Sequence, residues 1–155
     1  VLAAPAETPP TPSAGHDVLV GYGRVGSRIG AALPGDDLVV IESGGEGIER
    51  AGARARHVLV GNAADPSLLA NANIASARRL FVTIPEPFEA GQVVQQARAA
   101  NPGLDILARA HSEAAVEHLA AMGANLVVLG EHEIAHRMIE RATVGAAGNR
   151  CDKDT

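Results

Sequence analysis

The segment from Asp17 to Gly26 constrains the fold of this chain more than any other. It reads Asp-Val-Leu-Val-Gly-Tyr-Gly-Arg-Val-Gly, a short apolar run followed by the spacing Gly-x-Gly-x-x-Gly. A second apolar run at 38–41 follows and ends on the acid Glu42. A strand, a glycine turn, a helix and a second strand ending in an acid together predict a site for the phosphates and ribose of a nucleotide. The glycine spacing alone is a weak signal, and its alternative is a glycine-rich turn without a ligand.

Each part of this motif has its own physical role. Gly21 allows the strand to turn sharply, Gly23 allows the backbone to approach the phosphates, and Gly26 allows the next helix to pack closely on the sheet. The helix beginning near Arg24 directs free N–H groups and its positive dipole end at an anion. The Arg24 side chain can balance phosphate charge, or it is simply an exposed arginine. Glu42 is placed to accept hydrogen bonds from ribose hydroxyls and to repel a 2′-phosphate.

The composition favours a sheet whose strands are buried on both faces. Of the 155 residues 46% are hydrophobic, but only 2% are aromatic and Trp is absent, so the core must consist of Val, Leu, Ile and Ala. Such a core suits parallel strands covered by Ala-rich helices. The length corresponds to about one domain. The net charge of -5 argues against a nucleic-acid partner, since nucleic acids select basic surfaces.

Apolar runs alternate with amphipathic segments along the rest of the chain. This alternation predicts an α/β fold, a Rossmann-like doubly wound parallel sheet of six strands in the order 3-2-1-4-5-6 with helices on both faces. The strands are predicted at 17–21, 37–42, 56–60, 79–84, 104–109 and 125–129, and the helices at 24–33, 46–52, 66–72, 87–100, 112–122 and 131–143. Glycines in the second helix each cost about 1 kcal/mol relative to Ala, so we expect that helix to be short, frayed or mobile.

The ends of the chain read differently from its middle. Residues 1–15 are a Pro/Ala-rich linker, 16–144 form the domain, and 145–155 are predicted to be a flexible tail. The chain begins at Val1 and not at Met, so we expect a fragment whose linker joined it to an upstream neighbour. The single cysteine, Cys151, excludes a disulfide within the chain and favours a reducing compartment. Neither a signal peptide nor a membrane span is predicted.

Ligands of such sheets bind at the carboxyl ends of the strands, where the strand order reverses. Asn62 could hydrogen-bond an adenine edge there, or it could only turn the chain. Arg109 and His111 end the fifth strand and face a ligand, a partner subunit or solvent. The candidate binding residues are Gly21, Tyr22, Gly23, Arg24, Val25, Gly26, Glu42, Ser43, Asn62, Ala63, Thr83, Ile84, Pro85 and Arg109. No catalytic residue and no metal ligand is predicted.

The run His132-Glu133-Ile134-Ala135-His136 matches the zinc-protease signature H-E-x-x-H. On a helix both imidazoles would share one face, with Glu133 as a possible base. The run follows the last strand, however, and the carboxylates beyond the helix are those of Asp152 and Asp154 in the tail. We therefore interpret the two histidines as polar side chains on a helix surface that faces solvent or a partner.

An oxidoreductase that uses NAD is the alternative function. It would need a substrate pocket and an acid or base beside the nicotinamide. The one Tyr, Tyr22, lies in the phosphate loop and the one Lys, Lys153, lies in the tail, so a Tyr/Lys catalytic pair is excluded. His111 is the only candidate acid near the cleft. We therefore expect a binding domain that is not an enzyme.

With these residues placed, the chain resembles the N-terminal half of the RCK module, the TrkA-N domain, of Kef-type (YbaL-like) monovalent cation:proton antiporters. The resemblance covers roughly residues 17–143. Beyond the glycine motif it depends on the runs Gly61-Asn62-Ala63, Thr83-Ile84-Pro85 with Glu89-Ala90-Gly91, Ala108-Arg109-Ala110-His111, and Gly130-Glu131 through Ala135. These runs are much more specific in combination than the glycine motif is by itself.

The resemblance implies a regulatory domain that senses an adenine nucleotide, namely AMP or NAD(H), with ATP and ADP as alternatives. It implies that Gly21, Gly23, Arg24 and Gly26 hold phosphate, that Glu42 holds the ribose, and that Asn62 and Ala63 lie on the adenine side. Glu42 disfavours NADP, but the sequence does not choose among the other nucleotides.

The resemblance also implies partners. The domain would lie on the cytoplasmic face of a bacterial inner membrane, with the antiporter domain upstream in the same polypeptide. A homodimer would gate potassium or other monovalent cation transport. The helix at 131–143, with Ile134, Met138 and Ile139 on one face, would reach toward the partner subunit or else cover its own sheet. A separate potassium-channel gating subunit is the alternative.

Overall fold

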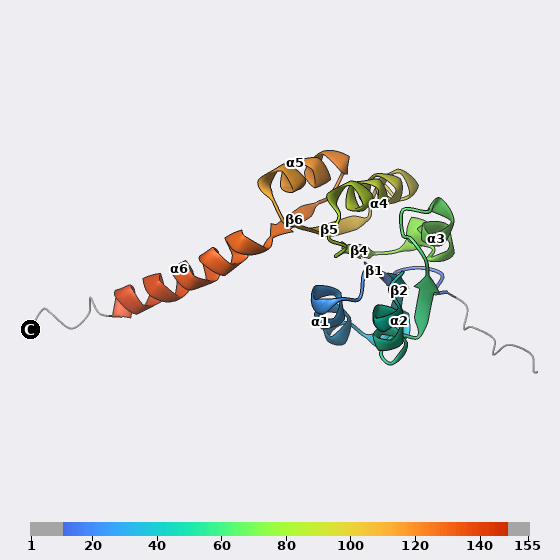
Figure 1. Cartoon of the computed structure of the whole chain (residues 1–155), viewed down its shortest axis with the longest axis horizontal. Helices are drawn as coiled ribbons and strands as arrows, with labels where there is room; N and C mark the ends of the chain where they lie inside the picture. The colour runs from blue at the N-terminus through green and yellow to red at the C-terminus, as the bar shows by residue number, and fades with distance from the viewer. Residues whose placement is uncertain (1–10, 149–155) are drawn as a thin grey trace, which may run out of the picture.

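Six short apolar segments form one parallel sheet in the computed structural model, which describes residues 11–148 (Figure 1). The strands are β1 (Asp17–Val20), β2 (Leu38–Glu42), β3 (His57–Val60), β4 (Arg79–Val82), β5 (Asp105–Ala110) and β6 (Leu126–Leu129). Their order is β3-β2-β1-β4-β5-β6, so the predicted topology is confirmed. The order reverses between β1 and β4, and this places the amino-terminal glycine motif at the switch point of the sheet.

Helices flank both faces of the sheet. They are α1 (Arg24–Ala32), α2 (Gly45–Gly52), α3 (Pro66–Asn71), α4 (Pro87–Ala100), α5 (Glu113–Met122) and α6 (Gly130–Gly148), with short 3-10 turns η1 (Gly35–Asp37) and η2 (Ile74–Ser76). Alternate residues of β1 enter different cores, because successive side chains of a strand point to opposite faces. Val18 and Val20 belong to the core beneath α3, α4 and α5, and Leu19 belongs to the core beneath α1 and α2.

The local sequence explains where several helices begin and end. Asp65 caps α3 by accepting a hydrogen bond of 2.9 Å from Ser67 N, and Pro66 occupies the first turn. Ser112 caps α5 in the same way, and Gly123, at φ +120°, ends it. The glycine-rich α2 is eight residues long, short as predicted.

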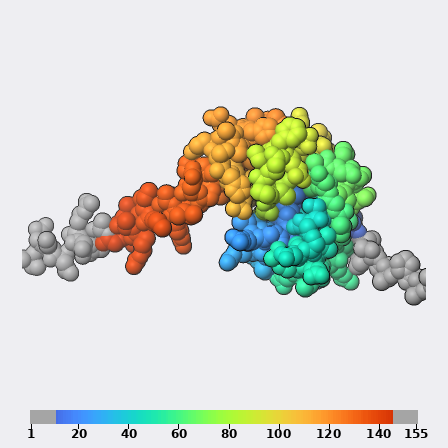
Figure 2. Space-filling view, in the orientation of Figure 1, coloured from blue at the N-terminus to red at the C-terminus, as the bar shows by residue number. Residues whose placement is uncertain are grey.

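Among residues 11–148, no helix covers one face of the sheet half formed by β4, β5 and β6. A groove of about 370 Å³ crosses β4, β5 and β6 on the side of α1. It is lined by Val25, Ile29, Phe81, Val82, Thr83, Leu107, Ala108, Arg109, Val128 and Gly130. The helix that follows β6 does not fill this groove, because α6 projects from the rounded body as an arm (Figures 1 and 2).

The α6 arm runs past the predicted end of the helix at residue 143 and reaches Gly148. All of residues 130–145 in this helix are exposed. The alternative in which this helix covers its own sheet is therefore wrong. None of the helices between residues 11 and 148 combines the length and apolarity needed to cross a membrane.

The start of the domain is fastened to the corner between α3 and η2. Asn73, at a left-handed φ of 52°, donates hydrogen bonds from Nδ2 to the carbonyls of Pro12 (3.2 Å) and Ser13 (2.7 Å). Gly15 N donates to Ser76 O at 2.9 Å, and His16 lies buried with Nε2 2.7 Å from Ala72 O. The last residues of the predicted linker thus pack on the domain. Residues 1–10 and 149–155, with Cys151, lie outside the described part of the chain.

Candidate nucleotide site

A cleft of about 380 Å³ opens at the switch point, beyond the carboxyl ends of β1 and β4. It is lined by Gly21, Gly23, Arg24, Val25, Gly26, Glu42, Ser43, Thr83, Ile84, Pro85, Glu86, Glu89 and Arg109. The fold thus brings together candidate residues from four separate segments of the sequence. Tyr22, Asn62 and Ala63 are the candidates that do not line this cleft, and Glu86 and Glu89 are additions to the predicted set.

The three glycines of the motif differ in what surrounds them. Gly21 has φ +90°, and a Cβ there would lie 2.6 Å from Thr83 Oγ1. A Cβ on Gly26 would overlap the carbonyl oxygen of Gly21. A Cβ on Gly23 would meet nothing within 4 Å. The first and third glycines are therefore required by the packing of the loop, whereas the second leaves open space at the cleft.

Two candidate residues support the loop. The Thr83 hydroxyl donates to the carbonyl of Val20 at 2.9 Å and lies 3.2 Å from that of Gly21, so it ties the end of β1 to β4. The Tyr22 ring is buried in the core and packs where Gly30 of α1 leaves room. The backbone N–H of Tyr22, and not its ring, points toward the acid Glu42.

Glu42 is held by backbone donors on two sides. Its carboxylate accepts hydrogen bonds from the N–H groups of Tyr22, Ser43 (2.8 Å) and Gly44 (2.9 Å). Gly47 lies directly beside it, because a Cβ there would be 2.6 Å from Oε2. Gly47 thus lets α2 approach the acid closely. A carboxylate has about four lone-pair positions, so three donors leave room for a ribose hydroxyl.

Two positively charged side chains, Arg24 of α1 and Arg109 of β5, line the cleft. Arg24 is exposed in the first turn of α1, and Arg109 is half-buried at the end of β5. Neither guanidinium forms an ion pair with a carboxylate of residues 11–148. No side chain caps α1, whose N-cap residue is Gly23. The free N–H groups of that helix and the two arginines are the groups of this cleft that could hold an anion.

Two acids at the start of α4 complete the cleft. Glu86 caps the helix and accepts hydrogen bonds from Glu89 N (2.7 Å) and Phe88 N (3.0 Å), and these bonds lower the pKa of its carboxyl. Glu89 is half-buried. Glu89 also lines a small cavity beside the cleft, together with Glu42, Gly61 and Ala63. The run Glu86-Pro87 is an N-cap followed by a first-turn proline, and this signal could have placed the first turn of α4 at the switch point.

The turn after β3 lies on the far side of this small cavity. Ala63 is buried and lines it. Asn62 is exposed, and its Oδ1 accepts a hydrogen bond of 2.8 Å from Ala64 N. The side-chain oxygen of Asn62 thus turns the chain, and its amide nitrogen remains available to a base.

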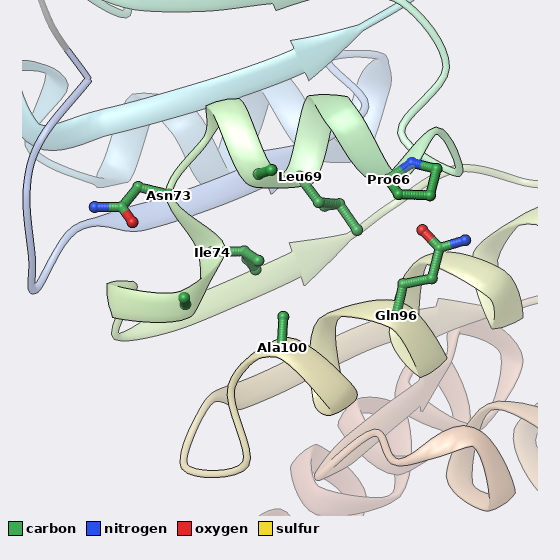
Figure 3. Close-up of a pocket in the computed structure, with 8 residues that line it drawn as sticks. Pro66, Leu69, Asn73, Ile74, Gln96 and Ala100 are labelled. Atoms are coloured by element: carbon green, nitrogen blue, oxygen red, sulfur yellow. The ribbon is translucent and has the colours of Figure 1, made fainter.

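A separate hollow of about 280 Å³ lies between α3, η2 and α4 (Figure 3). Pro66, Leu69, Ile74 and Ala100 give it apolar walls. Gln96 reaches into this wall from α4 and donates from Nε2 to Ala64 O at 3.0 Å. The lining contains no titratable side chain, so this hollow has no group for acid–base chemistry.

The histidine motif on α6 does not form a protease-like metal site among the described residues. Glu113, Glu131 and His132 bring their ligand atoms within 4.8 Å of one another, and all three side chains are exposed. His132 Nε2 lies 2.7 Å from Glu113 Oε1. Neither Glu133 nor His136 belongs to this group, although both are part of the motif.

Known proteins share clear similarity with this chain. The profile of the TrkA-N domain matches residues 18–130. The chain is 43% identical over 135 residues to the putative cation/proton antiporter YbaL of Escherichia coli K12, covering 86% of this chain and 24% of the relative. It therefore spans about a quarter of the length of that relative.

Solved structures of other domains also resemble this chain. The crystal structure of the TrkA-N domain of the E. coli inner membrane protein YbaL has a TM-score of 0.74 at 42% identity, covering 82% of this chain and 96% of that one. The AMP-bound Kef C-terminal domain of Shewanella denitrificans has a TM-score of 0.70 at 26% identity, covering 84% and 80%. The sequence and the fold of this chain are thus similar to those of domains from cation transport proteins.

Proposed function

The chain belongs to the TrkA-N domain family, and we propose that it is the nucleotide-sensing regulatory domain of a monovalent cation:proton antiporter. One observation carries this proposal. An uncapped helix N-terminus, two arginines without ion pairs, and an acid fixed by backbone donors converge on one cleft at the switch point. This combination suits the phosphate and the ribose of an adenine nucleotide.

Each side of the cleft has a role in this proposal. The N–H groups at the start of α1 and the side chains of Arg24 and Arg109 hold the phosphates. Glu42 accepts a hydrogen bond from a ribose hydroxyl. The base lies toward the small cavity at Ala63, where the amide nitrogen of Asn62 can donate to it. The AMP in the related Kef domain is consistent with this class of ligand.

The proposed role is regulation without chemistry. The single histidine at the end of β5, His111, is exposed and does not line the cleft. The lining contains arginines and carboxylates but no histidine, tyrosine or lysine. A ligand that prefers one dimer arrangement by about 10² shifts the balance by roughly 2.7 kcal/mol, which is enough to bias transport.

The membrane part of the proposed protein lies upstream in the same polypeptide. YbaL is described as an inner membrane protein, and this chain matches about a quarter of it. We infer by analogy that the domain lies on the cytoplasmic face of that membrane. Residues 12–16, fastened to the corner of α3 and η2, are the segment through which the domain is joined to the transporter.

The proposal includes a homodimer formed through α6. The side chains of Ile134, Met138 and Ile139 are each at least 60% exposed, and they share one side of the helix. The uncovered groove on β4, β5 and β6 has the matching apolar lining. In this proposal α6 of one copy covers the groove of the other. Thr83 and Arg109 line both the groove and the nucleotide cleft, so the two sites are adjacent.

Isothermal titration calorimetry with AMP and NADH tests the proposed site. We expect saturable binding to the wild type and a loss of about tenfold or more in Arg24→Ala, because a charge-assisted phosphate contact is lost. Arg28→Ala, one turn further along α1 and exposed, is the matched control and should bind as the wild type does. Equal affinities of the two variants would remove Arg24 from the site. Oxidation of NADH with carbonyl compounds would favour an oxidoreductase instead.

A further inference from the structure

The walls of the cleft contain more acids than bases. Arg24 and Arg109 contribute two positive charges, and Glu42, Glu86 and Glu89 contribute three negative charges, which leaves one net negative charge. This balance is unusual for a site that binds an anion, because phosphate is attracted to positive surroundings. The positions of the three acids decide which of them a phosphate chain would meet.

Two of the acids are already satisfied by the backbone. Glu42 accepts three N–H groups, and Glu86 accepts two at the positive end of α4. Each of these charges is therefore balanced locally by donors that remain in place when a ligand enters. Their effect on the rest of the cleft is reduced for the same reason.

Glu89 differs from the other two acids. Within residues 11–148 no group donates a hydrogen bond to its carboxylate and no cation pairs with it. The side chain is half-buried. It lines the main cleft and also the small cavity, whose walls include Glu42 and Ala63. A charge in this wall is less screened by water than a fully exposed one.

We propose that Glu89 determines the class of nucleotide: it favours ligands with few phosphate charges, a nucleoside monophosphate or a dinucleotide, over di- and triphosphates. This inference rests on the proposed function. AMP brings about two negative charges, which the two arginines balance. Each further phosphate adds a charge that meets Glu89 with no additional cation, unless a divalent cation accompanies it.

Calorimetric titrations with AMP, ADP and ATP, each in EDTA and in Mg²⁺, test the inference. In EDTA we expect wild-type affinity to fall by about tenfold or more from AMP to ATP, with partial recovery in Mg²⁺. Glu89→Gln should raise the ratio of ATP to AMP affinity about tenfold. It should also fold normally, because no hydrogen bond to its carboxylate is lost. Glu117→Gln, an exposed acid on α5, is the control for net charge and should keep the wild-type ratio.

Two results would overturn the inference while leaving the proposed function in place. One is wild-type binding of ATP in EDTA as tight as that of AMP. The other is the same affinity ratio in Glu89→Gln and Glu117→Gln. If the folded wild type, checked by circular dichroism, bound no nucleotide at all, the proposed function would fail, and this inference with it.

Discussion

At the scale of single residues, the three glycines of the motif have two different roles. Gly21 and Gly26 are required for the loop to fold, whereas Gly23 leaves space for a ligand. Gly26 has no room for a side chain because the carbonyl of Gly21 occupies that space. Gly21 combines a positive φ with contact to Thr83. Gly23 has φ -83° and open space around its Cβ direction. Only at Gly23 can a side chain be added without a clash inside the loop.

Gly23→Val should therefore keep the fold and lose the ligand. Its side chain would occupy the space in which a phosphate approaches the backbone, so we expect nucleotide affinity to fall at least about 100-fold. Gly26→Val, in contrast, should unfold or strongly destabilise the protein by overpacking. Thermal melts followed by circular dichroism, with calorimetry on the folded variants, distinguish these effects. Undiminished binding by Gly23→Val would mean that the ligand lies elsewhere.

The sequence predicts the position of a binding residue best where that position depends on the backbone. Most of the predicted binding residues line one cleft because parallel strands end at the same edge of the sheet. The direction of the Tyr22 ring could not be predicted, because it depends on the space beside Gly30 on another element. Glu89 belongs to the run Glu89-Ala90-Gly91, but its place in the wall follows from the packing of α4, which no local sequence pattern indicates.

At the scale of elements, the amino end of β1 is joined to β4 by an ion pair. Asp17 accepts two hydrogen bonds of 2.8 Å from Arg79 and lies 3.4 Å from Arg78, with only 5% of its side chain exposed. Burial by itself would raise the pKa of Asp17. The hydrogen bonds and charges of the two arginines outweigh it and bring the pKa below the ordinary value of 3.8. The ionised form is therefore the one that stabilises the fold.

This pair predicts how stability depends on pH. A carboxyl whose pKa is lowered by folding contributes its full stabilisation above the unfolded pKa and loses it as the pH falls through the folded pKa. We expect the free energy of unfolding to decrease below about pH 4. Asp17→Asn should cost about 2 kcal/mol at pH 7 and flatten that decrease. Urea titrations between pH 7 and pH 3 measure both effects, and a parallel decrease in wild type and variant would contradict the assignment.

The elements themselves were largely predictable, because each strand and helix carries its own periodicity and caps. Asp65-Pro66 and Met122-Gly123 mark real helix boundaries. The glycines of α2 looked only like a weakness in the sequence. The structure gives one of them a use, because Gly47 makes room for the carboxylate of Glu42. The direction of α6 was not predictable, since an apolar face does not specify the surface on which it packs.

At the scale of the whole molecule, a projecting helix with an exposed apolar face and an uncovered apolar groove occur in the same chain. Isolated exposed apolar residues are ordinary, but a contiguous apolar surface usually marks an interface. Because α6 projects away from its own groove (Figure 1), the proposed dimer brings α6 of one copy to the groove of the other. Association would then bury both at once.

Met138→Glu should therefore give a monomer. Met138 is 69% exposed, so the substitution should leave the melting temperature of the monomer nearly unchanged while placing a charge in the interface. Glu133→Lys is the control, because Glu133 lies at least about 100° around the helix from each of Ile134, Met138 and Ile139. Sedimentation equilibrium measures the masses. A dimer of Met138→Glu as tight as the wild-type dimer would exclude this interface.

The fastening of residues 12–16 has a mechanical consequence. The chain enters the sheet at the amino end of β1, held there by Asn73 and Ser76, and leaves it at the carboxyl end of β6 as α6 (Figure 1). Tension applied between these two points runs along the strands. The hydrogen bonds between β1, β4, β5 and β6 lie across that direction, so they are loaded in shear and must yield together, not one after another. The domain is therefore stiff along the line that joins its entry to its arm.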